Sequence, residues 1–226
     1  MTAYTKRLQK VTAVLCTTAL LAGCAAGTSD STEPAATTAQ VKAITIEPTA
    51  AYQTMNGFGA SACWWSQEVG NWENAKDILS LLYDENSGIG LNIYRYNLGA
   101  GSKDDATITD LDRRAEAFID KDGSYHWERD AAAQNALALA RSMNEDLRVT
   151  LFSNSAPVFY TANGKAYCDY LPDEENYVTN LEPERYADFA KYSIACAKHF
   201  TEAGYRVTGL SPINEPEWSW RGYEDG

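Results

Sequence analysis

The sequence predicts an α/β protein with one parallel sheet, arranged as in a (β/α)₈ TIM barrel. Strand-like and helix-like apolar patterns alternate along residues 41–226, and the strand-like segments end in loops rich in Asn, Arg, Glu and Trp. None of these strands is followed by the GxGxxG loop that marks the rival doubly wound fold. Because such alternation gives parallel strands with right-handed crossovers, the loop side chains should gather at one edge of the sheet.

The strands are predicted from composition and period. The segment 57–62 is made mostly of Gly, Ala and Ser, which lets neighbouring backbone approach closely. Residues 89–96, 147–152 and 205–210 are richer in β-branched and aromatic residues. Residues 42–47 alternate between polar and apolar and stop at Pro48, which predicts one more strand. Since a TIM barrel has eight strands, the chain is expected to hold only the first four β/α units, after an N-terminal signal and tether.

Helices are predicted between these strands. Asn71 is the expected N-cap of the first, whose apolar residues recur at helical spacing until Gly88. The second covers the Ala- and Leu-rich residues 131–143. The third has Pro183 in its first turn and Gly204 as a left-handed C-cap.

The N-terminal 40 residues are predicted to lie outside the fold. Residues 1–24 combine a basic start, a short apolar run and the box Leu-Ala-Gly-Cys that ends at Cys24. This pattern predicts a lipoprotein signal peptide with the lipid on Cys24, and the alternative is an ordinary secretory peptide. Residues 25–40 are predicted to be a flexible linker. The protein is therefore expected outside the cytoplasm, held at the cell surface or membrane by its lipid alone.

Charge and cysteine usage narrow the partners. A net charge of −12 argues against nucleic acid and anionic lipid and favours a neutral partner, such as a polysaccharide. Beyond the signal, the remaining cysteines lack CxxC spacing, and the chain has two histidines, so no metal site or cofactor is predicted. One disulfide with one free thiol, or three reduced thiols, are both open for Cys63, Cys168 and Cys196.

The strongest functional pattern is Asn214-Glu215-Pro216, which follows the last predicted strand. Pro216 disfavours helix at Glu215, so the carboxyl group is expected at the strand's end. There it suits protonation of a glycosidic oxygen, while Asn214 hydrogen-bonds a sugar hydroxyl. The alternative is an ordinary strand-to-loop turn.

Four motifs in order resemble glycoside hydrolase family 30, a group of retaining (β/α)₈ enzymes. They cover 53–61, 88–95, 153–164 and 211–216, within a similarity that extends from about Ile44 to Trp220. The resemblance implies that Glu215 is the general acid/base and that Asn214 donates to the sugar's 2-hydroxyl. It also implies that Arg95 orients the carboxylates.

Within the family, the Trp64-Trp65 pair and the Asn154 loop are similar to the endo-β-1,6-galactanase branch. Xylanase and glucosylceramidase relatives usually have Trp where this chain has Asn154. Family members place their nucleophilic Glu on the seventh strand, and no segment here corresponds to it. The resemblance therefore implies a fragment of the catalytic barrel, residues 41–226, that is inactive alone.

The other candidates each have a structural alternative. Arg95 is interpreted as a carboxylate clamp, or else as a structural ion pair. Of the tryptophans, Trp65 and Trp218 are chosen for sugar stacking, with core packing as the alternative. Asn154 reaches a sugar hydroxyl or only caps a turn.

Three functions follow in order of preference. The first is a retaining hydrolase of β-linked polysaccharide, in particular β-1,6-galactan, and the second is a non-catalytic glycan-binding surface lipoprotein. The third is a structural surface lipoprotein without a ligand.

Overall fold

A computed structural model describes residues 44–168 and 179–215. The chain divides into two units, 1–52 and 53–226. The predicted signal peptide (1–24) and linker (25–40), together with Cys24 and Trp218, lie outside the described residues, so those predictions stand untested.

In the first unit, the described residues contain a turn rather than the expected strand. The amide of Ala50 donates to the carbonyl of Glu47, and the Thr49 hydroxyl donates to the Glu47 carboxylate. The prediction of a strand at 42–47 is wrong for its described part, because alternation alone makes no strand without a partner for its backbone groups. No described strand pairs with residues 44–47.

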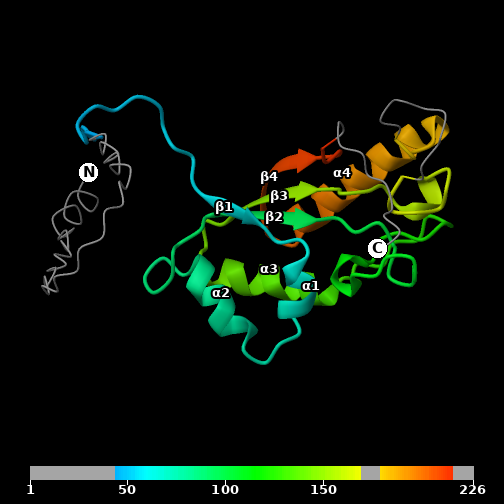
Figure 1. The fold of residues 1–226 in the computed structure, drawn as a ribbon, viewed down its shortest axis with the longest axis horizontal. Coiled ribbons are helices and arrows are strands. Elements are labelled where there is room, and N and C mark those ends of the chain that lie inside the picture. Colours follow the sequence, from blue (N-terminus) through cyan, green and yellow to red (C-terminus); the bar gives the residue numbers. More distant parts are fainter. Residues whose placement is uncertain (1–43, 169–178, 216–226) are drawn as a thin grey trace, which may run out of the picture. The chain divides into compact units, whose positions relative to one another are not determined.

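The second unit is built on a four-stranded parallel sheet, as predicted (Figure 1). The strands lie in sequence order, and their bounds are β1 (Gly59–Ser61), β2 (Ile93–Asn97), β3 (Arg148–Phe152) and β4 (Arg206–Ser211). Sequence order across parallel neighbours is the arrangement of a barrel wall, whereas a doubly wound sheet reverses its order part-way. The described strands therefore fit a TIM-barrel-like α/β fold.

β2 begins four residues later than the period of residues 89–96 predicts. The amides of Ile89 and Leu91 donate to carbonyls of Leu81 and Leu82, at the end of the preceding helix. Donors used in that way are not available to the sheet, so the ladder starts only at Ile93.

The helices are α1 (Trp65–Val69), α2 (Ala75–Tyr83), α3 (Ala131–Met143) and α4 (Tyr186–Glu202). The bounds of α3 confirm the prediction, and Gly204 has the left-handed φ of +86° expected after α4. Asn71 as an N-cap is wrong, because its amide closes the turn after α1 and α2 starts beyond Asn74. The helix α1 ends before Gly70, where an added Cβ would lie 1.8 Å from the Ala132 carbonyl oxygen.

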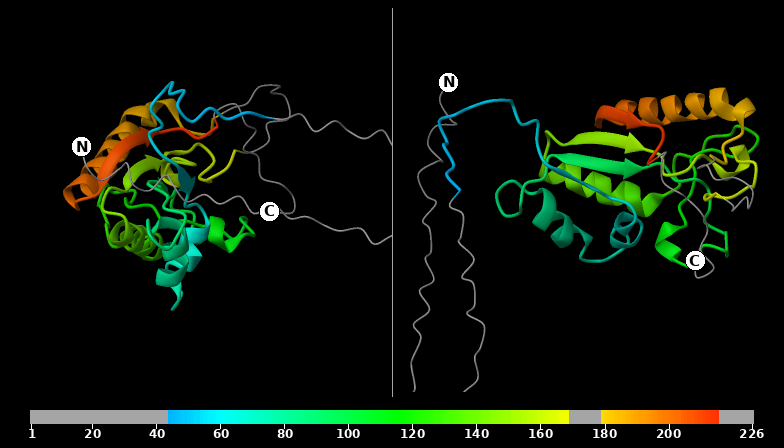
Figure 2. Two further views of the ribbon diagram at one scale, coloured as in Figure 1. Left: turned by 90° about the vertical axis from the view of Figure 1, so that its left-hand side faces the viewer. Right: turned by 45° about the horizontal axis from the view of Figure 1, so that its top comes forward.

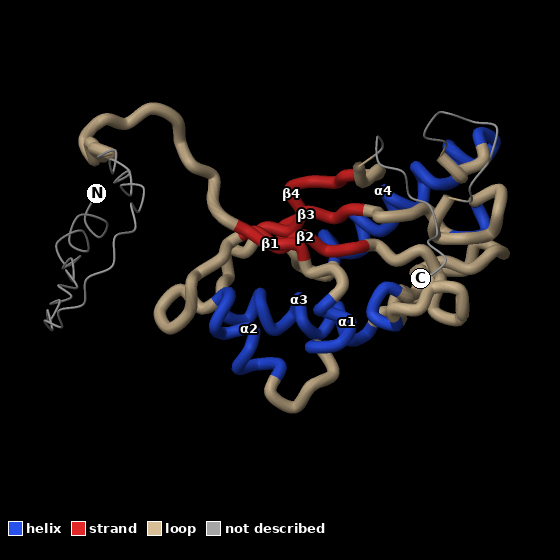
Figure 3. The backbone as a smooth tube through the Cα atoms, in the orientation of Figure 1, coloured by secondary structure: helices blue, strands red, loops and turns tan. Residues whose placement is uncertain are grey.

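The four α-helices of the described residues lie on the same face of the sheet. Figure 3 shows α1, α2 and α3 as a layer along it, and the right-hand view of Figure 2 shows α4 running alongside β4. Tyr94 and Tyr96 of β2 point into this layer, where Tyr94 lies 5.5 Å from the ring of Tyr83 and Tyr96 lies 4.9 Å from that of Phe200. Because side chains alternate along a strand, Arg95 faces the other side. Among the described residues, no helix has the length and apolar character to cross a bilayer.

A buried carboxyl group sits beneath β2. Asp130, immediately before α3, has only 5% of its surface exposed and adopts a left-handed φ of +53°. Its Oδ2 accepts a hydrogen bond of 2.6 Å from the Tyr96 hydroxyl, and its amide donates to Glu116. Burial, opposed in part by the Tyr96 hydrogen bond, raises the pKa of Asp130 from 3.8 to about 7.

This raised pKa predicts that the contribution of Asp130 to stability falls as the pH rises from 3.8 to about 7. Over that range the folded state still holds the proton that the unfolded Asp has lost, so deprotonation favours unfolding. Asp130→Asn should remove this contribution, so that its thermal unfolding midpoint gains on that of the wild type as the pH rises between 4 and 8. Asp104→Asn, in an exposed loop, is the control and should leave the slope unchanged. An unaltered slope in Asp130→Asn would contradict the assignment.

Candidate active site

The candidate site lies at the carboxyl ends of the strands. The loops that follow β2 and β3 gather beyond the arrowheads, at the right of Figure 1. They are joined to each other, since the amide of Val158 donates to Ala100 and Lys165 Nζ lies 3.0 Å from Asp105 Oδ1. The polar residues after successive strands therefore share one edge, as the sequence predicts.

Arg95 lies at the centre of this edge. It contacts three residues, one from each of the other strands or from the loop that follows it. Its Nη2 donates to Asn214 Oδ1 at 2.6 Å, beyond β4, and its Nη1 donates to Ser61 Oγ at 3.4 Å, on β1. The guanidinium carbon lies 3.3 Å from the ring centroid of Phe152, at the end of β3. The guanidinium thus has a fixed position and plane.

Two asparagines continue this contact. The side-chain Nδ2 of Asn214 donates to Asn154 Oδ1 at 2.9 Å. The backbone amide of Asn154 donates to Asn97 Oδ1 at 3.4 Å. The structure therefore brings together three of the predicted site residues, Arg95, Asn214 and Asn154, from segments far apart in the sequence. Their mutual contacts show how each is oriented; they do not by themselves identify a ligand.

Glu215 lies next to Asn214 and is exposed. Its backbone is left-handed, with φ of +44°, rather than extended as the following proline favours. Such strained non-glycine positions are uncommon and cluster at functional sites. Burial lowers the pKa of Arg95, and the charges of Cys63 and Glu215 oppose that change. Glu215 is thus within electrostatic reach of the Arg95 guanidinium.

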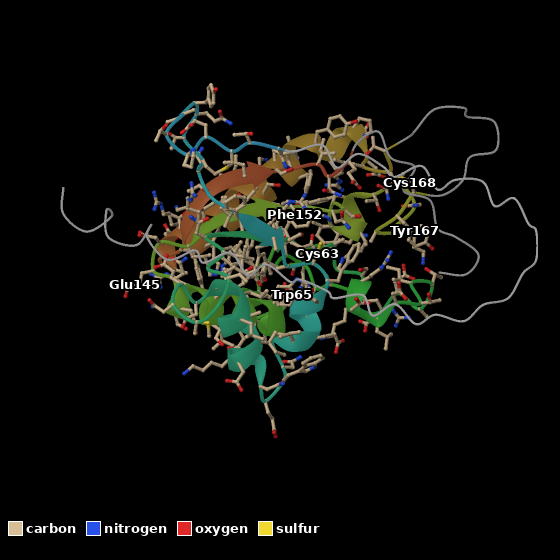
Figure 4. The ribbon with its side chains drawn as sticks, turned by 60° about the vertical axis from the view of Figure 1, so that its left-hand side comes forward. Cys63, Trp65, Glu145, Phe152, Tyr167 and Cys168 are labelled. Atoms are coloured by element: carbon tan, nitrogen blue, oxygen red, sulfur yellow. The ribbon has the colours of Figure 1, made fainter. Side chains whose placement is uncertain are left out.

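Trp64 and Trp65, which are adjacent in the sequence, have different surroundings. The Trp65 indole N–H donates to the Ser61 carbonyl, and its ring centroid lies 6.5 Å from that of Tyr94, on the helix side. Trp65 is packed against the core, so the core-packing alternative describes its contacts. In the view of Figure 4, Cys63 lies between Trp65 and Phe152. Trp64 instead lies beside Arg113, whose guanidinium carbon is 4.6 Å from the centroid of the Trp64 ring.

Sequence reasoning missed Ser61 and Phe152. The strand register explains why both residues lie near Arg95. Ser61 pairs directly with Arg95 on the neighbouring strand, and Phe152 lies two residues after Thr150, which is the partner of Arg95 on β3. A period of two places all three side chains on one face. The register itself, however, depends on how four distant segments align.

The described residues contain no group of three or more His, Cys, Asp or Glu side chains that could hold a metal ion. His126 contacts Asp120 and Glu128 and is accounted for by these surface pairs. In the part of the chain that the structure describes, Cys63 and Cys196 are free thiols, as in the reduced alternative for these two residues.

A parallel β/α sheet with an Arg–Asn–Asn cluster and a Glu at its carboxyl edge has the architecture of TIM-barrel enzymes. The model of O-glycosyl hydrolase family 30 matches residues 41–225, so the chain belongs to this family.

Two characterised relatives are similar over most of the chain. The endo-β-1,6-galactanase of Hypocrea rufa is 28% identical over 203 residues, covering 78% of this chain and 40% of that protein. The exo-β-1,6-galactobiohydrolase of Bifidobacterium longum subsp. longum is 27% identical over 242 residues, covering 80% and 16%. The chain therefore spans less than half the length of either relative.

Solved structures agree on the fold. A conserved exported protein from Bacteroides fragilis matches with a TM-score of 0.68 and 31% identity, over 77% of this chain and 37% of that one. The catalytic domain of xylanase C from Talaromyces cellulolyticus matches with a TM-score of 0.50 and 23% identity, over 74% and 38%.

The stacking of Arg95 on Phe152 predicts measurable coupling between the two side chains. A cation over an aromatic ring contributes about 0.5–2 kcal/mol, depending on how far water is excluded. A double-mutant cycle of Arg95→Met and Phe152→Leu should therefore give a coupling free energy in this range, measured by denaturant unfolding. Arg113→Met, a second Arg near an aromatic ring, combined with Phe152→Leu is the control pair and should be additive. Additivity of the Arg95 pair would contradict the contact.

Proposed function

We propose that this chain carries the acid/base half of a retaining glycoside hydrolase that acts on β-linked polysaccharide, most specifically β-1,6-galactan. The single observation that carries the proposal is the position of Glu215, beside Asn214 and within electrostatic reach of Arg95. The names of the Hypocrea rufa and Bifidobacterium longum relatives support the β-1,6-galactan assignment.

In this proposal Glu215 protonates the glycosidic oxygen and then deprotonates the incoming water. Such a group must release and recover a proton within one cycle. A nearby cation stabilises the carboxylate that remains after the proton is released. Arg95 supplies that cation, and its bonds to Asn214 and Ser61 limit its movement. Asn214 keeps one amide hydrogen after its bond to Asn154 and can donate it to a sugar hydroxyl.

Retention requires a second carboxylate about 5–5.5 Å from the first, which attacks the sugar carbon. We propose that this nucleophile is supplied from outside residues 41–226, as the seventh-strand Glu of the family resemblance implies. The four described strands would then hold the acid/base, and activity would require the remaining wall of the barrel.

Lipid attachment at Cys24 and a location at the cell surface are part of the same proposal. A polysaccharide is too large to cross a membrane unaided, so an enzyme that cleaves it benefits from display outside the cell. Palmitate labelling of the full chain, compared with Cys24→Ser, would test the anchor independently of activity.

The activity is tested in a chimera in which residues 41–226 replace the matching segment of the Hypocrea rufa enzyme. The chimera should cleave β-1,6-galactan with retention of the anomeric configuration, followed by ¹H NMR. Glu215→Gln should lower the rate by about 10²–10⁴-fold, the usual contribution of a general acid/base. Glu217→Gln is the matched control and should retain most of the activity.

Three results would contradict parts of this proposal. A folded chimera that cleaves another β-glycan in place of β-1,6-galactan would overturn the substrate. Robust turnover by residues 41–226 alone would overturn the external nucleophile. Glycan binding without hydrolysis, unaffected by Glu215→Gln in the folded chimera, would favour the non-catalytic alternative.

A further inference from the structure

The Arg95–Asn214–Asn154 contacts form a hydrogen-bond relay with only one possible polarity. A guanidinium has donors and no acceptor, so the group of Asn214 that faces Arg95 at 2.6 Å must be its carbonyl oxygen. The Asn214 amide nitrogen is then directed to Asn154, whose facing atom must be an acceptor, Oδ1, at 2.9 Å. The permanent charge on Arg95 therefore fixes the orientation of both amides.

This polarity determines what Asn154 presents on its far side. In a planar amide the nitrogen points away from the carbonyl oxygen, so Asn154 Nδ2 points away from Asn214. No described residue accepts a hydrogen bond from it. The backbone of Asn154 is also held in place, since its amide donates to the buried Asn97 side chain.

Turning either amide over is unfavourable. A flipped Asn154 would set its NH₂ group against that of Asn214, and flipping both would set the Asn214 NH₂ group against the Arg95 guanidinium. Each change replaces a hydrogen bond with two opposed donors. Hydrogen bonds in series also polarise one another, so the cation strengthens the outermost N–H as a donor.

We infer that Asn154 is a specificity residue whose N–H donors are directed away from Asn214, and that it therefore selects sugars with an acceptor oxygen at this corner of the site. The inference rests on the proposed function, because the ligand is taken to be a β-1,6-linked galacto-oligosaccharide. A hydroxyl or bridging oxygen of the sugar accepts the bond. Asn154 thus reads one oxygen of the substrate through an orientation that Arg95 imposes.

Asn154→Asp separates this inference from a structural role. Aspartate keeps the oxygen that Asn214 donates to, so the relay survives, but it removes both outward donors. Carboxylates bind sugar hydroxyls well as acceptors. The variant should therefore bind at least as tightly as the wild type if Asn154 serves as an acceptor, and more weakly if it serves as a donor.

The measurement is the affinity of the full chain for β-1,6-galactotriose by isothermal titration calorimetry. Asn154→Asp should weaken binding by about tenfold or more, the usual effect of losing one hydrogen bond to a buried or shielded site. Asn86→Asp, the same change in the exposed α2–β2 turn, is the matched control for added charge and should leave affinity unchanged. Thermal unfolding of each variant checks that the fold is intact.

A second measurement needs no variant to remain folded. The side-chain ¹⁵N–¹H₂ signals of Asn154 in the wild type should shift downfield for one proton and exchange more slowly with water when β-1,6-galactotriose is added. The Asn86 side-chain signals should not move.

The outcomes distinguish a failure of the role of Asn154 from a failure of the galactan assignment. Binding by the wild type with equal or tighter binding by Asn154→Asp, or unchanged Asn154 amide signals, overturns the role of Asn154 alone. Failure of the wild type to bind β-1,6-galactotriose, with binding to another β-glycan such as β-1,6-glucotriose, overturns the galactan assignment. In that case, the same Asn154 measurements with the bound glycan decide the donor role. Failure to bind any β-glycan overturns both.

Discussion

The constraint on which the site depends is a cation on the inner face of a parallel sheet. Arg95 cannot lose its charge and cannot accept a hydrogen bond, so everything that contacts it must be an acceptor, an anion or a ring face. Ser61, Phe152 and Asn214 are two acceptors and a ring, one from each of the other strands or the loop beyond it. One side chain thus fixes the relative positions of four strand ends.

The same arrangement explains why the two faces of β2 differ so much. Tyr94 and Tyr96 on one side lie in the apolar layer against α2 and α4, and they hold the strand in place by burial. Arg95 on the other side is then presented from a rigid element, which keeps its guanidinium from following a bound ligand. A site on such a strand is positioned by the core beneath it.

Sequence alone identified the parallel sheet, α3 and three candidate residues that the structure brings together, Arg95, Asn214 and Asn154, because each depends on local pattern. The helical period of α3 and the helix stop at Gly204 depend only on residues that are neighbours in the sequence. The predictions of a strand at 42–47 and of an N-cap at Asn71 are wrong, because tertiary contacts decide the structure at both places. Residues 44–47 have no described pairing partner, and the chain turns at Gly70 where α3 leaves no room for a Cβ.

The site residues that sequence could not supply are those that depend on register. Phe152 looks like an ordinary strand aromatic until the alignment of β2 with β3 brings it over Arg95. Trp65, by contrast, is a candidate for the site or for the core from its place after a strand, and its contacts in the structure are with Ser61 and Tyr94. Proximity to a strand's end narrows the candidates, but it does not decide to which side of the sheet a ring turns.

The polarity of the relay shows how a fixed charge can specify a neutral ligand. Sugars offer hydroxyl groups that both donate and accept, so a site made of freely rotating amides would discriminate poorly between hydroxyl geometries. Arg95 removes that freedom from Asn214, and Asn214 removes it from Asn154. What reaches the ligand is a donor with a defined direction. Because the energy that holds it comes from contacts within the protein, the orientation exists before the sugar arrives, and little ordering remains for binding to impose.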